Sequence, residues 1–156
     1  MSSLSASDAN TPCALPNLTL RLVLDTCVLK LATLPNPANK SAAVVELCMR
    51  KAITAYVTPD MLGEYQRVLS DCPLLLEQIQ EHFHLCLPLF SATAIEHEPD
   101  NRVLECALAC EADYLITVNT ARGHFDREFY GNVRVVTPGE FLQLSEVQAL
   151  LRGLTR

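Results

Sequence analysis

Four oxygen-bearing side chains stand at the ends of predicted strands and helices, where a ligand site can form. Asp25 ends the apolar run 22–24, and Asn119 follows a second apolar run. Glu64 lies on the flank of the apolar stripe of a predicted helix, and Asp100 opens another helix. Carboxylates that converge without Lys or Arg between them repel one another unless a cation is present. Hard oxygen ligands favour Mg²⁺ or Mn²⁺, and such ions can activate water for attack on a phosphodiester.

Each of these positions also has an ordinary structural interpretation. Asp25 and Asp100 can cap the helices that follow them. Glu64 can be a solvated residue on the flank of its helix, and Asn119 can be a turn residue at a strand end. Asp113 is best interpreted as a turn residue between a helix and a strand and is left out of the site. Taken singly the four signals are weak, so the prediction rests on their combination.

The elements that must position these residues alternate along the chain. Strands are predicted at 18–25, 53–58, 84–90, 114–118 and 133–136, and helical segments at 29–34 and 41–51 and from residues 58, 73, 100 and 138 onward. This alternation predicts an α/β layered fold with a mainly parallel five-stranded sheet. If the first and fourth strands are neighbours, their carboxyl ends bring Asp25 and Asn119 together, at the edge where such sheets bind ligands.

Two predicted helix starts rest on capping residues. Thr58 is expected to cap the helix that carries Glu64, with Pro59 at its first position. Ser41 is expected to cap the helix over 41–51. Between the last two predicted strands, the loop 120–131 is interpreted as a charged, solvated segment. Its cationic side chains could alternatively contact phosphate: Arg122, His124 and Arg127.

Length and composition indicate one globular domain. The chain has 156 residues, of which 49% are hydrophobic and 19% charged, and a chain of this size buries roughly 70% of its unfolded surface. Residues 1–17 are Ser- and Asn-rich and are predicted to be a flexible leader, followed by a single domain over 18–156. No apolar run approaches a membrane span and no signal peptide is visible, so a cytoplasmic protein without membrane contact is expected.

Charge and cysteine content restrict the remaining function classes. The net charge of −6 argues against nucleic-acid binding through bulk positive charge. It leaves open a nuclease whose carboxylates are neutralised by divalent cations. The seven cysteines form no C-x-x-C pair and no zinc-site spacing. They are therefore expected to be free thiols in a reducing compartment.

The order of these motifs resembles that of the PIN domain family, a nuclease fold typical of toxins in bacterial toxin–antitoxin pairs. The segments that carry the resemblance are LVLDT at 22–26, TPDMLGEY at 58–65, EPDNRVLECA at 98–107, ADYLITVN at 112–119 and VRVVTPGEFL at 133–142. The first three hold Asp25, Glu64 and Asp100, and the fourth ends in Asn119. The resemblance covers about residues 20–142.

This resemblance implies a metal-dependent endoribonuclease on a three-layer α/β/α sandwich. Asp25, Glu64 and Asp100 would hold Mg²⁺ or Mn²⁺, and Asn119 would take the place of a fourth acidic residue. The implied partners are an RNA substrate, an inhibitory antitoxin protein and a second copy of the chain in a homodimer.

Two positions depart from the family pattern and keep other functions open. Cys27 stands where the family usually has Asn, and Asn119 stands where many members have Asp. The first alternative is a catalytically weakened PIN-like module that binds RNA or a partner protein without cleaving. The second is a cysteine hydrolase with Cys27 as nucleophile, although no His or Lys has an identifiable pairing with it.

Overall fold

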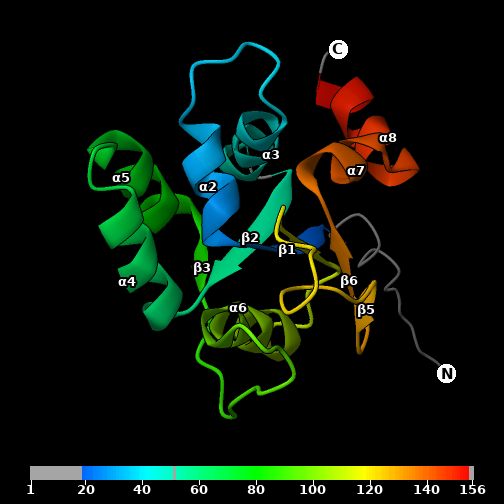
Figure 1. Ribbon diagram of the computed structural model, residues 1–156. Helices are drawn as coiled ribbons and strands as arrows, with labels where there is room; N and C mark the ends of the chain where they lie inside the picture. Colours follow the sequence, from blue (N-terminus) through cyan, green and yellow to red (C-terminus); the bar gives the residue numbers. More distant parts are fainter. Residues whose placement is uncertain (1–18, 51, 155–156) are drawn as a thin grey trace, which may run out of the picture.

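The computed structural model describes residues 19–50 and 52–154, so the predicted leader 1–17 lies outside the described residues. The described residues form one mixed sheet with helices on both of its faces (Figure 1). The strands are β1 (Leu20–Leu24), β2 (Ile53–Val57), β3 (His84–Leu85), β4 (Tyr114–Ile116), β5 (Phe129–Tyr130) and β6 (Val133–Val136). The helices are α2 (Thr26–Ala32), α3 (Lys40–Met49), α4 (Pro59–Val68), α5 (Pro73–His82), α6 (Glu98–Ala109), α7 (Pro138–Gln143) and α8 (Ser145–Leu154).

The sheet has the strand order β3-β2-β1-β4-β6-β5, and only the β5–β6 pair is antiparallel. The predicted five-stranded sheet is therefore wrong in its count, since the described residues form six strands. The additional strand, β5, lies inside the predicted loop 120–131. It is only two residues long, too short to show an alternating pattern, and it is joined to β6 through Gly131 at φ 63°.

The middle of the sheet is covered on both faces, as the predicted α/β/α sandwich requires. Figure 1 shows α2 and α3 on one side of the sheet and α6 on the other. Leu22, Val23 and Leu24 of β1 are fully buried, and so are Leu115 and Ile116 of β4. A strand buried on both faces needs a continuous apolar run, which is why β1 and β4 are recognisable in the sequence.

The first and fourth predicted strands are neighbours, as the predicted site requires. Leu24 of β1 lies in register with Ile116 of β4. The parallel pairing continues for one further hydrogen bond, in which the amide of Asp25 donates to the carbonyl of Ile116 at 3.0 Å. The residues that follow these two strands therefore emerge at the same edge of the sheet.

Helices α2 and α3 both begin earlier than predicted. Helix α2 starts at Thr26, directly after β1, with Asp25 at its N-cap position. Helix α3 starts at Lys40, and its N-cap is Asn39 rather than the predicted Ser41. The Asn39 side chain accepts a hydrogen bond from the amide of Ala42, which satisfies one of the free donors of the first turn.

Helices α4 and α6 carry two of the predicted site residues. The predicted cap of α4 is confirmed, since the Thr58 hydroxyl accepts a hydrogen bond from the amide of Met61 at 3.1 Å. Helix α6 begins at Glu98 with His97 at its N-cap position, so Asp100 lies within the first turn instead of opening the helix. None of the helices in the described ranges 19–50 and 52–154 combines the length and apolar character that a bilayer span needs.

Candidate metal centre

Asp25 points across the sheet edge instead of capping the helix that follows it. Its side chain makes no capping hydrogen bond to α2. Oδ2 instead accepts a hydrogen bond of 2.7 Å from the hydroxyl of Thr117 and a weak contact from the Cys27 thiol at 3.4 Å. The residue is only 5% exposed. The interpretation of Asp25 as a capping residue is thus wrong. Its carboxylate instead contacts Thr117, which directly follows β4.

Cys27 does not have the character of a nucleophile. Burial, reinforced by the neighbouring Asp25 carboxylate, raises the pKa of the Cys27 thiol to about 11. The thiol is therefore protonated near neutral pH, whereas the reactive form of cysteine is the thiolate. Its position beside Asp25 and Thr117 makes it a packing neighbour of the carboxylate.

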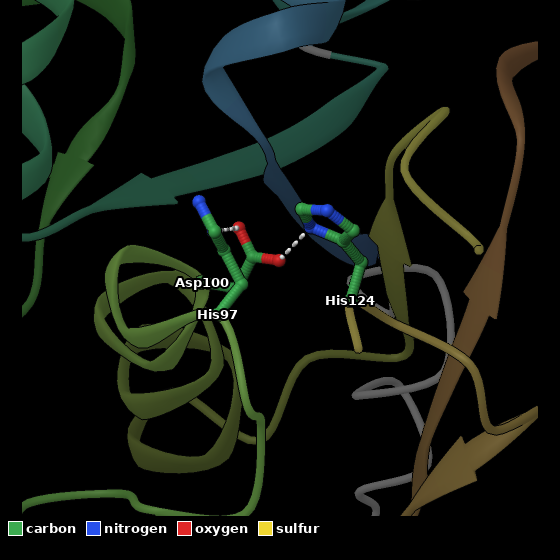
Figure 2. A group of neighbouring side chains, drawn as sticks. All are labelled: His97, Asp100 and His124. Carbon is green, nitrogen blue, oxygen red and sulfur yellow. Dashed lines mark hydrogen bonds and ion pairs between the residues drawn. The ribbon is translucent and has the colours of Figure 1, made fainter. Parts of the chain in front are cut away.

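Asp100 is bound by two histidines (Figure 2). Its oxygen Oδ2 lies 2.9 Å from Nδ1 of His124, and Oδ1 lies 3.3 Å from Nδ1 of His97. The residue is 4% exposed. Asp100 is not the predicted N-cap residue, because it lies within the first turn of α6. The N-cap position is taken by His97.

The pKa of Asp25 is raised by its surroundings, among them the carboxylate of Asp100. Burial raises the pKa of Asp25 above its ordinary value, and the negative charge of Asp100 raises it further. The Thr117 hydroxyl opposes this shift by hydrogen bonding to the ionised form. The described hydrogen-bond partners of the Asp25 side chain are neutral groups, so the desolvation and repulsion are not offset by a cationic side chain among them.

Asn119 reaches the same carboxylate from the segment after β4. Its side-chain nitrogen lies 3.5 Å from Oδ2 of Asp25, at the limit of a hydrogen bond. Its backbone amide donates to the Thr117 hydroxyl at 2.9 Å, which links the two residues that contact Asp25. Positive φ angles of non-glycine residues in the described ranges are confined to Glu111, so Asn119 is not a left-handed turn residue. The structure therefore brings Asn119 and Asp25 together.

Glu64 lies in α4, and the residue after it, Tyr65, connects this helix to β1 by a hydrogen bond. The Tyr65 hydroxyl donates a hydrogen bond of 2.6 Å to the carbonyl of Leu24, the residue before Asp25. Tyr65 is fully buried, whereas Glu64 itself is half-buried. Tyr65 therefore links α4 to the carboxyl end of β1, whereas the described contacts do not join the Glu64 carboxylate to Asp25 or Asp100.

The loop residues of interest fall into different environments. His124 contacts Asp100, whereas the guanidinium of Arg127 lies 5.4 Å from the ring centre of Tyr130 and Arg122 is exposed. Sequence reasoning missed the role of His97 and of Thr117. The spacing of His97 and Asp100, three residues apart at a helix start, was an available signal for the first. Thr117 had no comparable signal, since its role depends on the pairing of β1 with β4.

The donor set suits a divalent cation. Asp25 and Asp100 are desolvated carboxylates at one edge of the sheet, and their repulsion is the condition that a bound cation relieves. Asn119 offers a neutral amide beside Asp25. Oxygen donors of this kind match the preferences of Mg²⁺ and Mn²⁺.

Comparison with known proteins identifies the family of the chain. The family model described as PIN domain matches residues 21–121, which is more than half of the chain. Comparison with curated proteins finds no match. The matched range includes α4, α6, β4 and all of β1 except Leu20, the elements that carry or position Asp25, Glu64, Asp100 and Asn119. PIN domains are generally nucleases and usually bind divalent metals. This chain, with its mostly parallel sheet and its acidic edge, belongs to the PIN domain family.

Proposed function

We propose that the protein is a divalent-metal-dependent endoribonuclease that hydrolyses RNA phosphodiesters. The observation that carries the proposal is the pair Asp25 and Asp100, two carboxylates that are 5% and 4% exposed at one edge of the sheet. Asp100 raises the pKa of Asp25, and the described side-chain partners of Asp25 are uncharged. A buried carboxylate such as Asp25, with neutral partners and a second carboxylate acting on it, is well explained by a bound cation.

In this proposal, Asp25, Glu64 and Asp100 hold Mg²⁺ or Mn²⁺. When bound, the ion would activate a water molecule and stabilise the charge that develops on the phosphodiester. Thr117 holds Oδ2 of Asp25 by a 2.7 Å hydrogen bond and so fixes the orientation of that carboxylate. Asn119 stands in place of a fourth acidic residue and is neutral. The site therefore carries a smaller negative charge than four carboxylates would give it.

The proposed biological setting is that of a toxin in a toxin–antitoxin pair. Family membership supports this setting, because the resemblance to the PIN nucleases extends over the segments that hold all four site residues. The proposed partners are an RNA substrate, an antitoxin protein that keeps the nuclease inactive and a second copy of the chain. Because the net charge is −6, the bound cation would also offset repulsion between the site and the phosphates.

The proposal is tested by cleavage of a single-stranded RNA with Mg²⁺ or Mn²⁺, with and without EDTA. Asp25→Asn is expected to reduce cleavage to background, because it removes a negative charge from the ion-binding edge while keeping the side-chain shape. The matched control is Asp71→Asn, which makes the same change in the exposed turn between α4 and α5. Equal cleavage by Asp25→Asn and the wild type, or cleavage that persists in EDTA, would overturn the proposal.

A second candidate function is an RNA-binding module that no longer cleaves. The observation that favours it is the neutral pair beside Asp25, in which Asn119 and Cys27 contact the carboxylate without adding charge. Titration calorimetry with Mn²⁺ separates the two functions when combined with the cleavage assay. Binding of Mn²⁺ together with cleavage supports the nuclease, whereas RNA binding without either supports the module.

A further inference from the structure

Three potential metal ligands converge at the start of α6. His97, Asp100 and His124 each offer one donor atom, a ring nitrogen or a carboxylate oxygen, and these three atoms all lie within 4.8 Å of one another. Figure 2 shows one oxygen of the Asp100 carboxylate facing each imidazole, and the centres of the two rings are 4.6 Å apart. The side chains of His97 and His124 are 50% and 33% exposed, whereas that of Asp100 is 6% exposed. The cluster therefore has a buried carboxylate at its base and is open to solvent at the imidazoles.

The backbone holds the two histidines in place from both sides. The amide of His97 donates a 2.9 Å hydrogen bond to the carbonyl of Gly123, the residue before His124. Gly123 has φ 89°, a conformation that L side chains rarely adopt, and a Cβ there would lie 3.2 Å from Oε1 of Glu96. Phe125, on the other side of His124, is 1% exposed, and its amide donates to the carbonyl of Asn119. The two imidazole rings thus converge because hydrogen bonds and the buried Phe125 hold the loop around His124 in place.

The chemistry of this donor set differs from that of an all-oxygen edge. Imidazole nitrogen suits Zn²⁺ and its first-row neighbours, whereas Mg²⁺ prefers oxygen ligands and octahedral geometry. Two histidines and one carboxylate leave positions open for water or a phosphate oxygen, as in catalytic zinc sites. Bonds of about 2.1 Å place adjacent ligand atoms about 3.0–3.4 Å apart. The separations of 2.9 and 3.3 Å between the Nδ1 atoms and the Asp100 oxygens are close to this range.

We propose that His97, Asp100 and His124 form a binding site for a first-row transition-metal dication such as Zn²⁺ or Co²⁺, which they bind in preference to Mg²⁺. The inference deepens the proposed function and rests on it through the shared ligand Asp100. It adds His97 and His124 to the proposed carboxylate ligands and specifies a first-row transition-metal dication as the bound ion. The competing interpretation is that the histidines only pair with the Asp100 carboxylate as protonated imidazoles.

The test is a Co²⁺ titration followed by visible absorption, because Co²⁺ reports nitrogen ligands through its absorption bands and replaces Zn²⁺ in such sites. The variant His97→Ala/His124→Ala is expected to lower Co²⁺ affinity at least about tenfold, since even outer-shell partners of ligands contribute about 10–100-fold. The matched control is His82→Ala/His84→Ala, which removes the other two histidines of the chain, at the end of α5 and in β3. The control is expected to bind Co²⁺ as the wild type does.

A second measurement needs no variant and so does not depend on folding of the histidine mutant. In the wild-type protein, nitrogen NMR of the four imidazoles during a Zn²⁺ titration is expected to shift two residues and leave two unchanged. Perturbation of His82 and His84 instead, or of none, would overturn the inference. Co²⁺ binding that the double variant retains, or that equimolar Mg²⁺ displaces, would overturn it as well.

The outcomes separate this inference from the proposed function. Histidine-dependent Co²⁺ binding without RNA cleavage by any metal would overturn the nuclease proposal and leave the site standing. Cleavage with Mg²⁺ that requires Asp25, without histidine-dependent Co²⁺ binding, would leave the nuclease standing and overturn the site.

Discussion

At the scale of single residues, the ionised carboxylate of Asp25 is unfavourable for folding. Asp25 and Asp100 are both nearly fully buried, and the pKa of Asp25 is raised by desolvation and by the charge of Asp100. The 2.7 Å hydrogen bond from Thr117 lowers this cost without removing it. Groups of this kind persist where activity requires them, and replacing them commonly increases stability.

Asp25→Asn is therefore expected to raise the free energy of unfolding of the metal-free protein at neutral pH by about 0.5–2 kcal/mol. The amide keeps the shape of the carboxylate, can still accept the Thr117 hydrogen bond and removes the repulsion with Asp100. Urea denaturation in EDTA measures the difference. Asp71→Asn, in an exposed turn, is expected to leave the free energy of unfolding unchanged. A lower value for Asp25→Asn would show that the carboxylate stabilises the metal-free fold.

At the scale of elements, the position of α4 in the proposed site depends on the hydrogen bond that joins this helix to β1. Helix α4 carries Glu64 and is tied to the last residue of β1 by the 2.6 Å hydrogen bond from Tyr65 to Leu24. Its start is held by the Thr58 cap after β2. Helix α4 is thus held by two buried contacts, one at β1 through Tyr65 and one after β2 through Thr58.

Tyr65→Phe is expected to lower the free energy of unfolding by about 0.5–1.5 kcal/mol, the typical net value of one buried hydrogen bond. Affinity for Mn²⁺, measured by calorimetry, is expected to fall as well, because α4 loses its link to the residue before Asp25. Tyr56→Phe makes the same chemical change at a half-buried tyrosine of β2 and is expected to alter neither quantity. An unchanged Mn²⁺ affinity in a less stable Tyr65→Phe would show that the contact supports the fold alone.

At the scale of the whole molecule, buried phenols and thiols favour the fold only in their protonated forms. Burial raises the pKa of Tyr114, helped by its hydrogen bond to Glu146, to about 12, and burial alone raises that of Cys48 to about 12. The pKa of Tyr65 is also raised, chiefly by burial. In the unfolded chain, tyrosine ionises near pH 10. Between pH 10 and 12 the native state therefore binds more protons than the unfolded state, and stability falls as pH rises.

The free energy of unfolding is accordingly expected to be maintained below about pH 8 and to decrease above about pH 9, where first the thiols and then the phenols ionise in the unfolded chain. Tyr114→Phe is expected to be less stable at neutral pH, because it loses the 2.9 Å hydrogen bond to Glu146. Its alkaline decrease should be shallower than that of the wild type, because one ionising group is absent. Urea denaturation at several pH values measures both. A slope identical to the wild type would contradict the assignment of the shift to Tyr114.

Much of the fold follows from local patterns that the sequence carries. The run 22–24 predicts a strand buried on both faces, because only such a strand tolerates continuous apolar residues, and β1 is fully buried there. Thr58 followed by Pro59 predicts the start of α4, because both residues suit the first turn of a helix. Asp25 and Asn119 could be placed at one edge by assuming that the strands before them pair, and they do.

The boundaries that were wrong depend on more than local propensity. Helix α2 begins at Thr26 because the parallel pairing of β1 with β4 ends at the Asp25 amide. Strand β5 exists because two residues find a partner in β6, and a segment so short has no pattern of its own. Helix α6 starts ahead of Asp100, which turns that residue from a predicted cap into the centre of the histidine cluster.

The sequence by itself determined the alternation of strands and helices and the four candidate ligands Asp25, Glu64, Asp100 and Asn119. Apolar periodicity and the ends of strands can be recognised from residues that are close together in the chain. Only the tertiary structure decided what surrounds these four residues. Thr117 meets Asp25 across paired strands, 92 positions away in sequence. His124 meets Asp100 because a loop fastened by Gly123 and Phe125 returns to the start of α6. Such contacts join distant segments through packing and hydrogen bonds, and no local pattern encodes them.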